Sequence, residues 1–164
     1  MRSVTLDAQV PDAQADNIFD RLRDFAAYPR FTDAVREVKV TPRDDDTVES
    51  EWSVNFRNGV LRWTELDRFD PASRTISFDQ TTGDFEQFTG TWQVEQQAST
   101  VAVRFASEFD LGMPSLAAMV DPIAEDALVE NLKLIIRGLL GNTVTFSPAS
   151  QHADRRPAQA GLER

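Results

Sequence analysis

The stretch PSLAAMVDPIAEDALVENLKLIIRGLL, residues 114–140, decides the fold, because it carries the longest helical pattern in the chain. At the roughly 100° per residue of an α-helix, its charged side chains fall on one narrow arc that faces water: Asp126, Glu130, Lys133 and Arg137. The opposite face is mostly apolar: Ala124, Ala127, Leu128, Asn131, Leu132, Ile135, Gly138 and Leu139. Gly141 and Asn142 supply a stop signal. We therefore expect a long C-terminal helix with one buried face.

Upstream of this helix, apolar residues mostly alternate with polar ones, which predicts strands. Residues 3–10 form the first alternating run, and 18–25 and about 28–33 then indicate two short helices. From Val35 onward six further strands follow, separated by turns such as Asn58-Gly59 and Asp70-Pro71. Consecutive hairpins place neighbours in the chain side by side. The sequence thus predicts an α+β fold in which a seven-stranded antiparallel sheet curves around the C-terminal helix.

The residue types that are missing narrow the possible chemistry. The chain has no Cys, and its one histidine, His152, lies near the C-terminus. A thiolate nucleophile, a Ser-His-Asp triad and an ordinary zinc site are therefore not expected in the folded part. Acid–base work would fall to carboxylates, Lys, Tyr, Arg or water, and we expect neither a metal nor another cofactor.

Charge and hydropathy set expectations for partners and location. The formal net charge is −10, which disfavours nucleic acid and stable association with an anionic membrane. No apolar run approaches the roughly 20 residues of a membrane span, and the N-terminus leads directly into a strand pattern. We expect a cytoplasmic protein, a monomer or homodimer, with one ligand-binding domain over residues 1–146. Residues 147–164 are expected to form a disordered tail.

Several stretches resemble one known superfamily. Tyr28-Pro29-Arg30-Phe31 is similar to a short helical segment at the cavity mouth of helix-grip proteins, which include START domains and birch-pollen-type allergens. The run from Trp63-Thr64 to Asp70-Pro71 resembles a strand of the polyketide cyclase/aromatase branch, and so do Gly90-Thr91-Trp92 and residues 105–109. The resemblance covers residues 1–141. It implies a helix-grip fold with an internal cavity for an apolar molecule, and cofactor-independent cyclisation or dehydration of a polyketide, which an acyl carrier protein could present.

Two positions depart from the aromatase/cyclase pattern. Asp67 stands where an arginine is usual, and Ser107 stands where some members have a histidine. The cationic group that would stabilise an oxyanion is therefore missing from its usual place, so any cyclase chemistry must differ in detail.

Three polar residues are candidate catalytic groups: Glu65, Asp67 and Asn131. If the strand is regular, Glu65 and Asp67 share the face of Trp63 and point into the interior. Burial would raise their pKa values, so that a carboxyl group could take a proton from the carbon beside a ketone or protonate a leaving hydroxyl. Alternatively, a bulge or a wet strand end turns them outward. Asn131 would need a partner, since an unpaired buried amide costs about 1–3 kcal/mol. A ligand, Gln80, Ser107 or buried water could supply one.

The remaining candidates for ligand contact face the expected interior or its mouth: Tyr28, Phe31, Trp52, Phe56, Trp63, Phe78, Gln80, Phe88, Trp92, Phe105, Ser107 and Ile135. For the aromatic residues ordinary core packing is the plainer interpretation, and for Gln80 and Ser107 it is internal hydrogen bonding. For Tyr28 it is a packing role with the hydroxyl in water. A curved sheet and one helix, however, leave an interior too wide to close without a cavity.

The leading functional hypothesis is therefore a cofactor-independent polyketide cyclase or aromatase. The alternative is a non-catalytic carrier that sequesters a lipid, a quinone or a finished natural product. The negative surface makes a third class, a ribosome- or partner-binding protein, less attractive.

Overall fold

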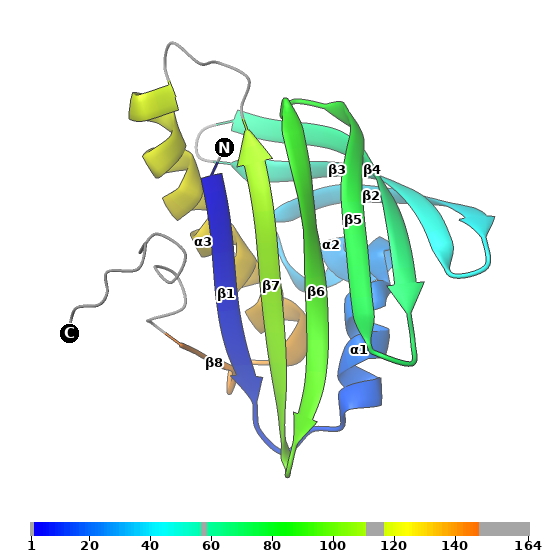
Figure 1. The fold of residues 1–164 in the computed structure, drawn as a ribbon. Coiled ribbons are helices and arrows are strands. Elements are labelled where there is room, and N and C mark those ends of the chain that lie inside the picture. Colours follow the sequence, from blue (N-terminus) through cyan, green and yellow to red (C-terminus); the bar gives the residue numbers. More distant parts are fainter. Residues whose placement is uncertain (1, 57–58, 111–116, 148–164) are drawn as a thin grey trace, which may run out of the picture.

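The computed structural model describes residues 2–56, 59–110 and 117–147, and for 117–124 only the backbone. Strand β1 opens the described chain, and short helical segments follow it, with α1 and α2 labelled in Figure 1. Six consecutive strands follow, and a long helix and a short strand complete the described chain. The elements are β1 (Arg2–Val10), α1 (Ala15–Arg23), the 3-10 helix η1 (Phe25–Ala27), α2 (Tyr28–Phe31), β2 (Val35–Asp44), β3 (Thr47–Phe56), β4 (Gly59–Asp70), β5 (Thr75–Gly83), β6 (Gln87–Gln97), β7 (Thr100–Asp110), α3 (Ala117–Leu140) and β8 (Thr145–Phe146).

The strands form one antiparallel sheet in the order β2-β3-β4-β5-β6-β7-β1-β8. Strands β2 to β7 are joined by hairpins, and β1 pairs along its whole length with β7, which brings the start of the chain beside residues 101–109. This confirms the predicted fold. The sheet has eight strands rather than seven because Thr145 and Phe146 add a short pairing to β1. A segment of two residues is too short to show the alternation of apolar and polar residues that predicts a strand.

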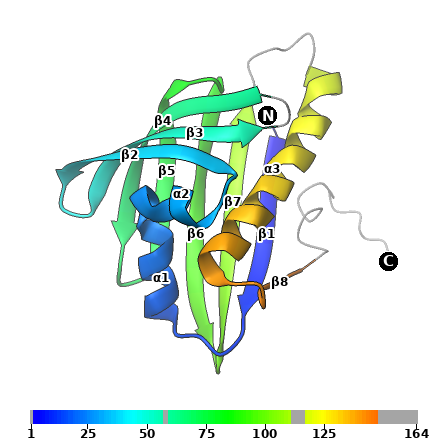
Figure 2. The same ribbon diagram turned by 180° about the vertical axis from the view of Figure 1, so that it is seen from behind.

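The helices cover the concave face of the curved sheet. Figure 2 shows α3 crossing this face obliquely, with α1 and α2 beside it and β2, β3 and β4 bending around the other side. Alternate residues of each strand point toward the helices, so that Val101, Val103, Phe105 and Phe109 of β7 are all buried. Among the described residues no helix has the length and apolarity needed to cross a membrane.

Helix α3 has the two faces that its sequence predicts. Asp126, Glu130 and Arg137 are exposed, whereas Leu132, Ile135 and Leu139 of the opposite face are buried. The side chain of Ala124, the first three residues of the quoted stretch (114–116) and the tail 148–164 lie outside the described residues, as does Asn58 in the predicted β3–β4 turn. Phe56 lies directly opposite Gly59, which fits the expected tight hairpin.

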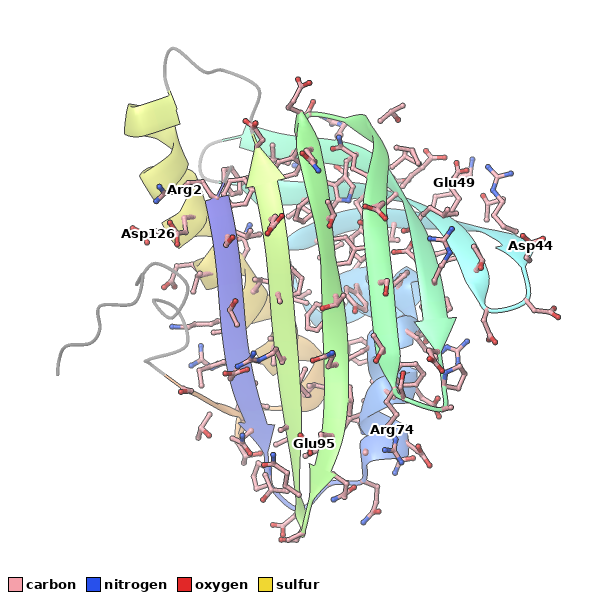
Figure 3. All side chains as sticks on the ribbon, in the orientation of Figure 1. Arg2, Asp44, Glu49, Arg74, Glu95 and Asp126 are labelled. Carbon is pink, nitrogen blue, oxygen red and sulfur yellow. The ribbon has the colours of Figure 1, made fainter. Side chains whose placement is uncertain are left out.

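Two contacts fix α3 relative to the rest of the fold. Near its C-terminal end a Cβ atom at Gly138 would lie 2.3 Å from the carbonyl oxygen of Phe31, so only glycine permits this close approach to α2. Nearer its N-terminal end Glu125 is buried and accepts a 2.6 Å hydrogen bond from Arg2 of β1. Figure 3 shows Arg2 at the start of β1, beside α3. The helix is thereby held at both ends over the sheet, which defines the space beneath it.

Candidate functional site

An internal cavity of about 80 Å³ lies between the concave face of the sheet and α3. Its walls are almost entirely apolar and come from β3 to β7, from the segment of short helices and from α3. The lining residues are Phe25, Tyr28, Trp52, Val54, Phe56, Leu61, Trp63, Glu65, Phe78, Phe85, Phe88, Trp92, Phe105, Leu128, Asn131, Leu132 and Ile135. The cavity is smaller than the roughly 300–1,000 Å³ of most small-molecule sites. A ligand of several rings therefore requires the walls to move apart.

Aromatic rings give the cavity flat walls. Trp52 of β3 and Trp63 of β4 lie opposite each other in the strand register, and their rings stack at an angle of 4° with centroids 5.9 Å apart. Phe85 and Phe88 form a second stacked pair with centroids 4.5 Å apart. Aromatic rings at these separations pack against each other, so each pair presents flat apolar surface to the cavity.

Glu65 is the one carboxylic acid among the described lining residues, and it is almost completely buried. The indole Nε1 of Trp63 donates a 2.7 Å hydrogen bond to its Oε1. Directly along the strand, Asp67 is fully buried, and its Oδ2 accepts a 2.5 Å hydrogen bond from the hydroxyl of Ser50. The same Ser50 hydroxyl accepts a 2.7 Å hydrogen bond from Nε1 of Trp52.

Glu65 and Asp67 lie two residues apart on the same buried face of β4, so each carboxyl group affects the protonation of the other. Burial, reinforced by the neighbouring Asp67, raises the pKa of Glu65 well above its usual value. Burial also raises the pKa of Asp67, to about 6, although its interactions with Glu65 and Ser50 oppose this shift. Oδ1 of Asp67 has no hydrogen-bond partner among the described residues. Both buried groups therefore bind a proton more readily than an exposed carboxylate does.

The backbone of β4 explains why both carboxyl groups point inward. Burial alternates along the strand, with Glu65, Asp67 and Phe69 buried and Arg68 and Asp70 exposed. The pairing with β5 shifts register between Thr64 and Glu65, yet this irregularity leaves both carboxylates on the concave face. The alternative that a bulge turns them outward is thus wrong, because the alternation within β4 is unbroken.

Asn131 lies at the cavity wall and links α3 to the sheet. Its side-chain nitrogen donates a 2.6 Å hydrogen bond to the backbone carbonyl of Asn55 in β3. The partner is therefore neither Gln80 nor Ser107. An amide has two N–H groups and a carbonyl, so one N–H and the carbonyl remain for a ligand.

Most of the predicted ligand-contact residues lie in the lining, and four predicted site residues do not: Phe31, Asp67, Gln80 and Ser107. Phe31 is 55% exposed on α2. Asp67 lies behind Glu65, and Gln80 donates a hydrogen bond to the backbone oxygen of Phe85. Ser107 is buried outside the lining. The expectation that the hydroxyl of Tyr28 lies in water is wrong, because it is buried and donates a 2.6 Å hydrogen bond to the carbonyl of Leu22.

The sequence reasoning missed six lining residues: Phe25, Val54, Leu61, Phe85, Leu128 and Leu132. Four of them could have been found from the face that they share with a residue already chosen: Val54 with Trp52, Leu61 with Trp63, and Leu128 and Leu132 with Asn131. Phe85 lies in the turn between β5 and β6, where no periodicity applies.

Comparisons with known proteins agree with this architecture. Among solved structures, the protein TTHA0849 from Thermus thermophilus superposes with a TM-score of 0.78 at 20% identity, over 84% of this chain and 94% of that chain. The Zhui aromatase/cyclase from Streptomyces sp. R1128 gives a TM-score of 0.70 at 19% identity, over 82% of this chain and 91% of that chain. At such identities these two matches show the fold.

A third structure, the di-domain ARO/CYC BexL from the BE-7585A biosynthetic pathway, is 26% identical with a TM-score of 0.64. The match covers 84% of this chain and 46% of that chain, so this protein spans about half of the di-domain protein. No curated protein matches the chain by sequence.

A family model extends the comparison to the sequence. The model described as "Polyketide cyclase / dehydrase and lipid transport" matches residues 11–134, which are most of the chain. Together with the apolar cavity, this match supports a hydrophobic ligand-binding role. The chain belongs to the polyketide cyclase / dehydrase and lipid transport family, within the helix-grip superfamily that its sequence resembles.

Proposed function

We propose that this protein binds an apolar ketone in its cavity and that the Glu65–Asp67 pair moves the protons of an aldol cyclisation or dehydration. The substrate class would be a polyketide intermediate. One observation carries the proposal: a carboxyl group, Glu65, lines an apolar cavity, and a second, fully buried carboxyl group, Asp67, lies two residues away on the same strand face. The Zhui aromatase/cyclase, which shares the fold, adds support.

The charge of the pair favours action as a base in the first step. A carboxylate in this buried pair carries a negative charge that burial disfavours, and a proton taken from the ligand neutralises it. Glu65 faces the ligand and would receive the proton from the carbon beside the ketone, while Asp67 keeps its hydrogen bond from Ser50. Burial raises the pKa of Glu65 toward the operating pH, which makes proton transfer more efficient.

The same pair can return a proton in the second step. In a β-hydroxy ketone the C–H bond breaks to give an enolate. The pair then protonates the hydroxyl group, the C–O bond breaks, and a carbon–carbon double bond and one water molecule form. The pair ends with the same number of protons that it held at the start. One pair of carboxyl groups in an apolar cavity therefore suffices for a dehydration, and the reaction balances without a cofactor.

One observation favours the second candidate, a non-catalytic carrier. The strongest hydrogen-bond donors at the cavity are already used inside the protein, because Tyr28 donates to Leu22 and Trp63 donates to Glu65. A developing enolate would then depend on the remaining N–H of Asn131. A carrier needs no such donor.

The test uses a one-ring β-hydroxy ketone, 4-hydroxy-4-phenylbutan-2-one, whose dehydration to the conjugated enone is followed by ultraviolet absorbance. We expect the wild-type protein to accelerate the reaction and Glu65→Gln to lose about 100-fold or more of that rate. Glu51→Gln changes an exposed carboxylate on the neighbouring strand and should keep the wild-type rate. Binding of the ketone without turnover, or turnover that Glu65→Gln leaves unchanged, would overturn the catalytic proposal and favour the carrier.

A further inference from the structure

Among the described residues that line the cavity, none carries a positive charge. None of these residues is Lys, Arg or His, and the ionisable groups among them are Glu65 and Tyr28. Asp67 adds a second carboxyl group directly behind the wall. The charges that act on the Tyr28 hydroxyl come from Glu65, Asp67 and Asp24, and all of them raise its pKa further after burial has done so. The charges that act on the Tyr28 hydroxyl are therefore all negative.

The described residues packed around the carboxyl pair supply no compensating cation. Ser50 of β3 donates to Asp67, and across β4 the paired residues of β5 are Phe78 and Gln80. From the short helices, Arg23 lies over the ring of Phe69, with its guanidinium carbon 4.6 Å from the ring centroid.

Arg23 forms its ion pair at the protein surface and not with the buried carboxyl pair. It is partly exposed and pairs at 3.7 Å with Asp46 at the surface. From α3, Asn131 contributes an uncharged amide to the cavity wall. Within the described part of the chain, the buried negative charge of the pair is thus stabilised by hydrogen bonds and not by an ion pair.

We propose that this cavity selects its ligand by charge, accepting neutral and cationic apolar molecules and rejecting carboxylates. The inference rests on the proposed binding function of the cavity and names the class of molecule that it takes. Two like charges in an interior of low dielectric repel strongly, and no lining group offers a salt bridge in exchange. Ketones, quinones, esters and apolar amines fit these walls, whereas the anion of a fatty or aromatic acid does not.

The experiment compares three one-ring probes of similar size: acetophenone, benzylammonium and benzoate. Binding to the full chain is measured at pH 8 by quenching of tryptophan fluorescence and by ligand-observed NMR. We expect acetophenone and benzylammonium to bind at least tenfold more tightly than benzoate. In Asp67→Asn the gap between acetophenone and benzoate should narrow to less than threefold, while Glu51→Gln, on the outer face, should keep it.

A second measurement avoids any dependence on the folding of a variant. Asp67, whose pKa is about 6, is mostly protonated at pH 5, while benzoate remains an anion. Benzoate affinity should therefore rise relative to pH 8, and acetophenone affinity should stay constant. Equal binding of acetophenone and benzoate at pH 8 would overturn charge selection and leave the binding function intact. If none of the three probes binds, the cavity-binding function itself fails, and this inference fails with it.

Discussion

Asp67 is a fully buried carboxylate that destabilises the protein at neutral pH. Its pKa is raised, mainly by burial, from 3.8 to about 6, which corresponds to roughly 3 kcal/mol of folding free energy. The folded state binds this proton more tightly than the unfolded state. Stability is therefore greatest below the unfolded pKa and falls as the pH rises from about 4 to about 6. A buried charge that lowers stability and lies directly behind the cavity wall is more typical of a functional group than of a structural one.

Replacing this carboxylate tests that account. We expect Asp67→Asn to stabilise the protein by about 1–3 kcal/mol at pH 8, because the buried charge disappears while Ser50 can still donate its hydrogen bond. The gain should shrink as the pH falls toward 4, where the wild-type carboxyl group becomes neutral. Urea unfolding at pH 4, 6 and 8, followed by tryptophan fluorescence, measures this. A loss of stability of equal size at all three pH values would contradict it.

Ser50 positions the carboxyl pair without touching the cavity. Its hydroxyl donates to Asp67 and accepts from the indole of Trp52, so Ser50→Ala removes a stabilising contact from the charged form of the pair. We expect the pKa of the pair to rise and the pH profile of the proposed dehydration to move upward. Ser53→Ala, on the same strand but the opposite face, should leave the profile unchanged. An unchanged profile in Ser50→Ala, with activity lost only through instability, would show that Ser50 is merely structural.

At the scale of elements, the position of α3 depends on a close approach to α2. A Cβ atom at Gly138 would collide with the carbonyl of Phe31, which is backbone and cannot rotate away, and would crowd Thr32 at 3.1 Å. Alanine is the better helix former by about 1 kcal/mol, so propensity and packing make opposite predictions at this residue.

We expect the packing effect at Gly138 to outweigh the helix propensity of alanine. Gly138→Ala should destabilise the protein by about 1–3 kcal/mol, since α2 and α3 must separate to admit the methyl group. Leu134→Ala, at an exposed position on the same helix, should change stability by about 0.5 kcal/mol or less. Thermal unfolding of both variants compares the two effects. A stabilised Gly138→Ala protein would mean that the helices are not in contact here.

Periodicity was sufficient to predict the strands and the long helix, because each of them has one face in the core and one in water. The inward direction of Glu65 and Asp67 also follows from the alternation along β4. The bond from Asn131 to the carbonyl of Asn55 could not be predicted, because it depends on where α3 crosses the sheet. The raised pKa values of Glu65 and Asp67 likewise depend on burial and on side-chain geometry, which no spacing rule contains.

At the scale of the whole molecule, the cavity volume that side-chain packing leaves open decides which ligands fit. The cavity of about 80 Å³ is closed by aromatic rings and by the aliphatic residues of α3, so its size depends on single side chains. Ile135 and Ile136 are adjacent on α3 and both buried, yet only Ile135 lines the cavity. Alanine substitutions at these two positions form a matched pair. Both remove similar packing contacts, but only the one at Ile135 changes the cavity.

We expect Ile135→Ala and Ile136→Ala each to lose about 2–4 kcal/mol of stability, since each removes buried methyl and methylene groups. Only Ile135→Ala adds volume next to the carboxyl pair, and it should favour a two-ring ketone, 2-acetylnaphthalene, over acetophenone relative to the wild-type protein. Ile136→Ala should keep the wild-type ratio of the two dissociation constants. Equal ratios in all three proteins would mean that ligands enter by moving α3 as a unit, so that the volume measured without a ligand does not limit the size of the guest.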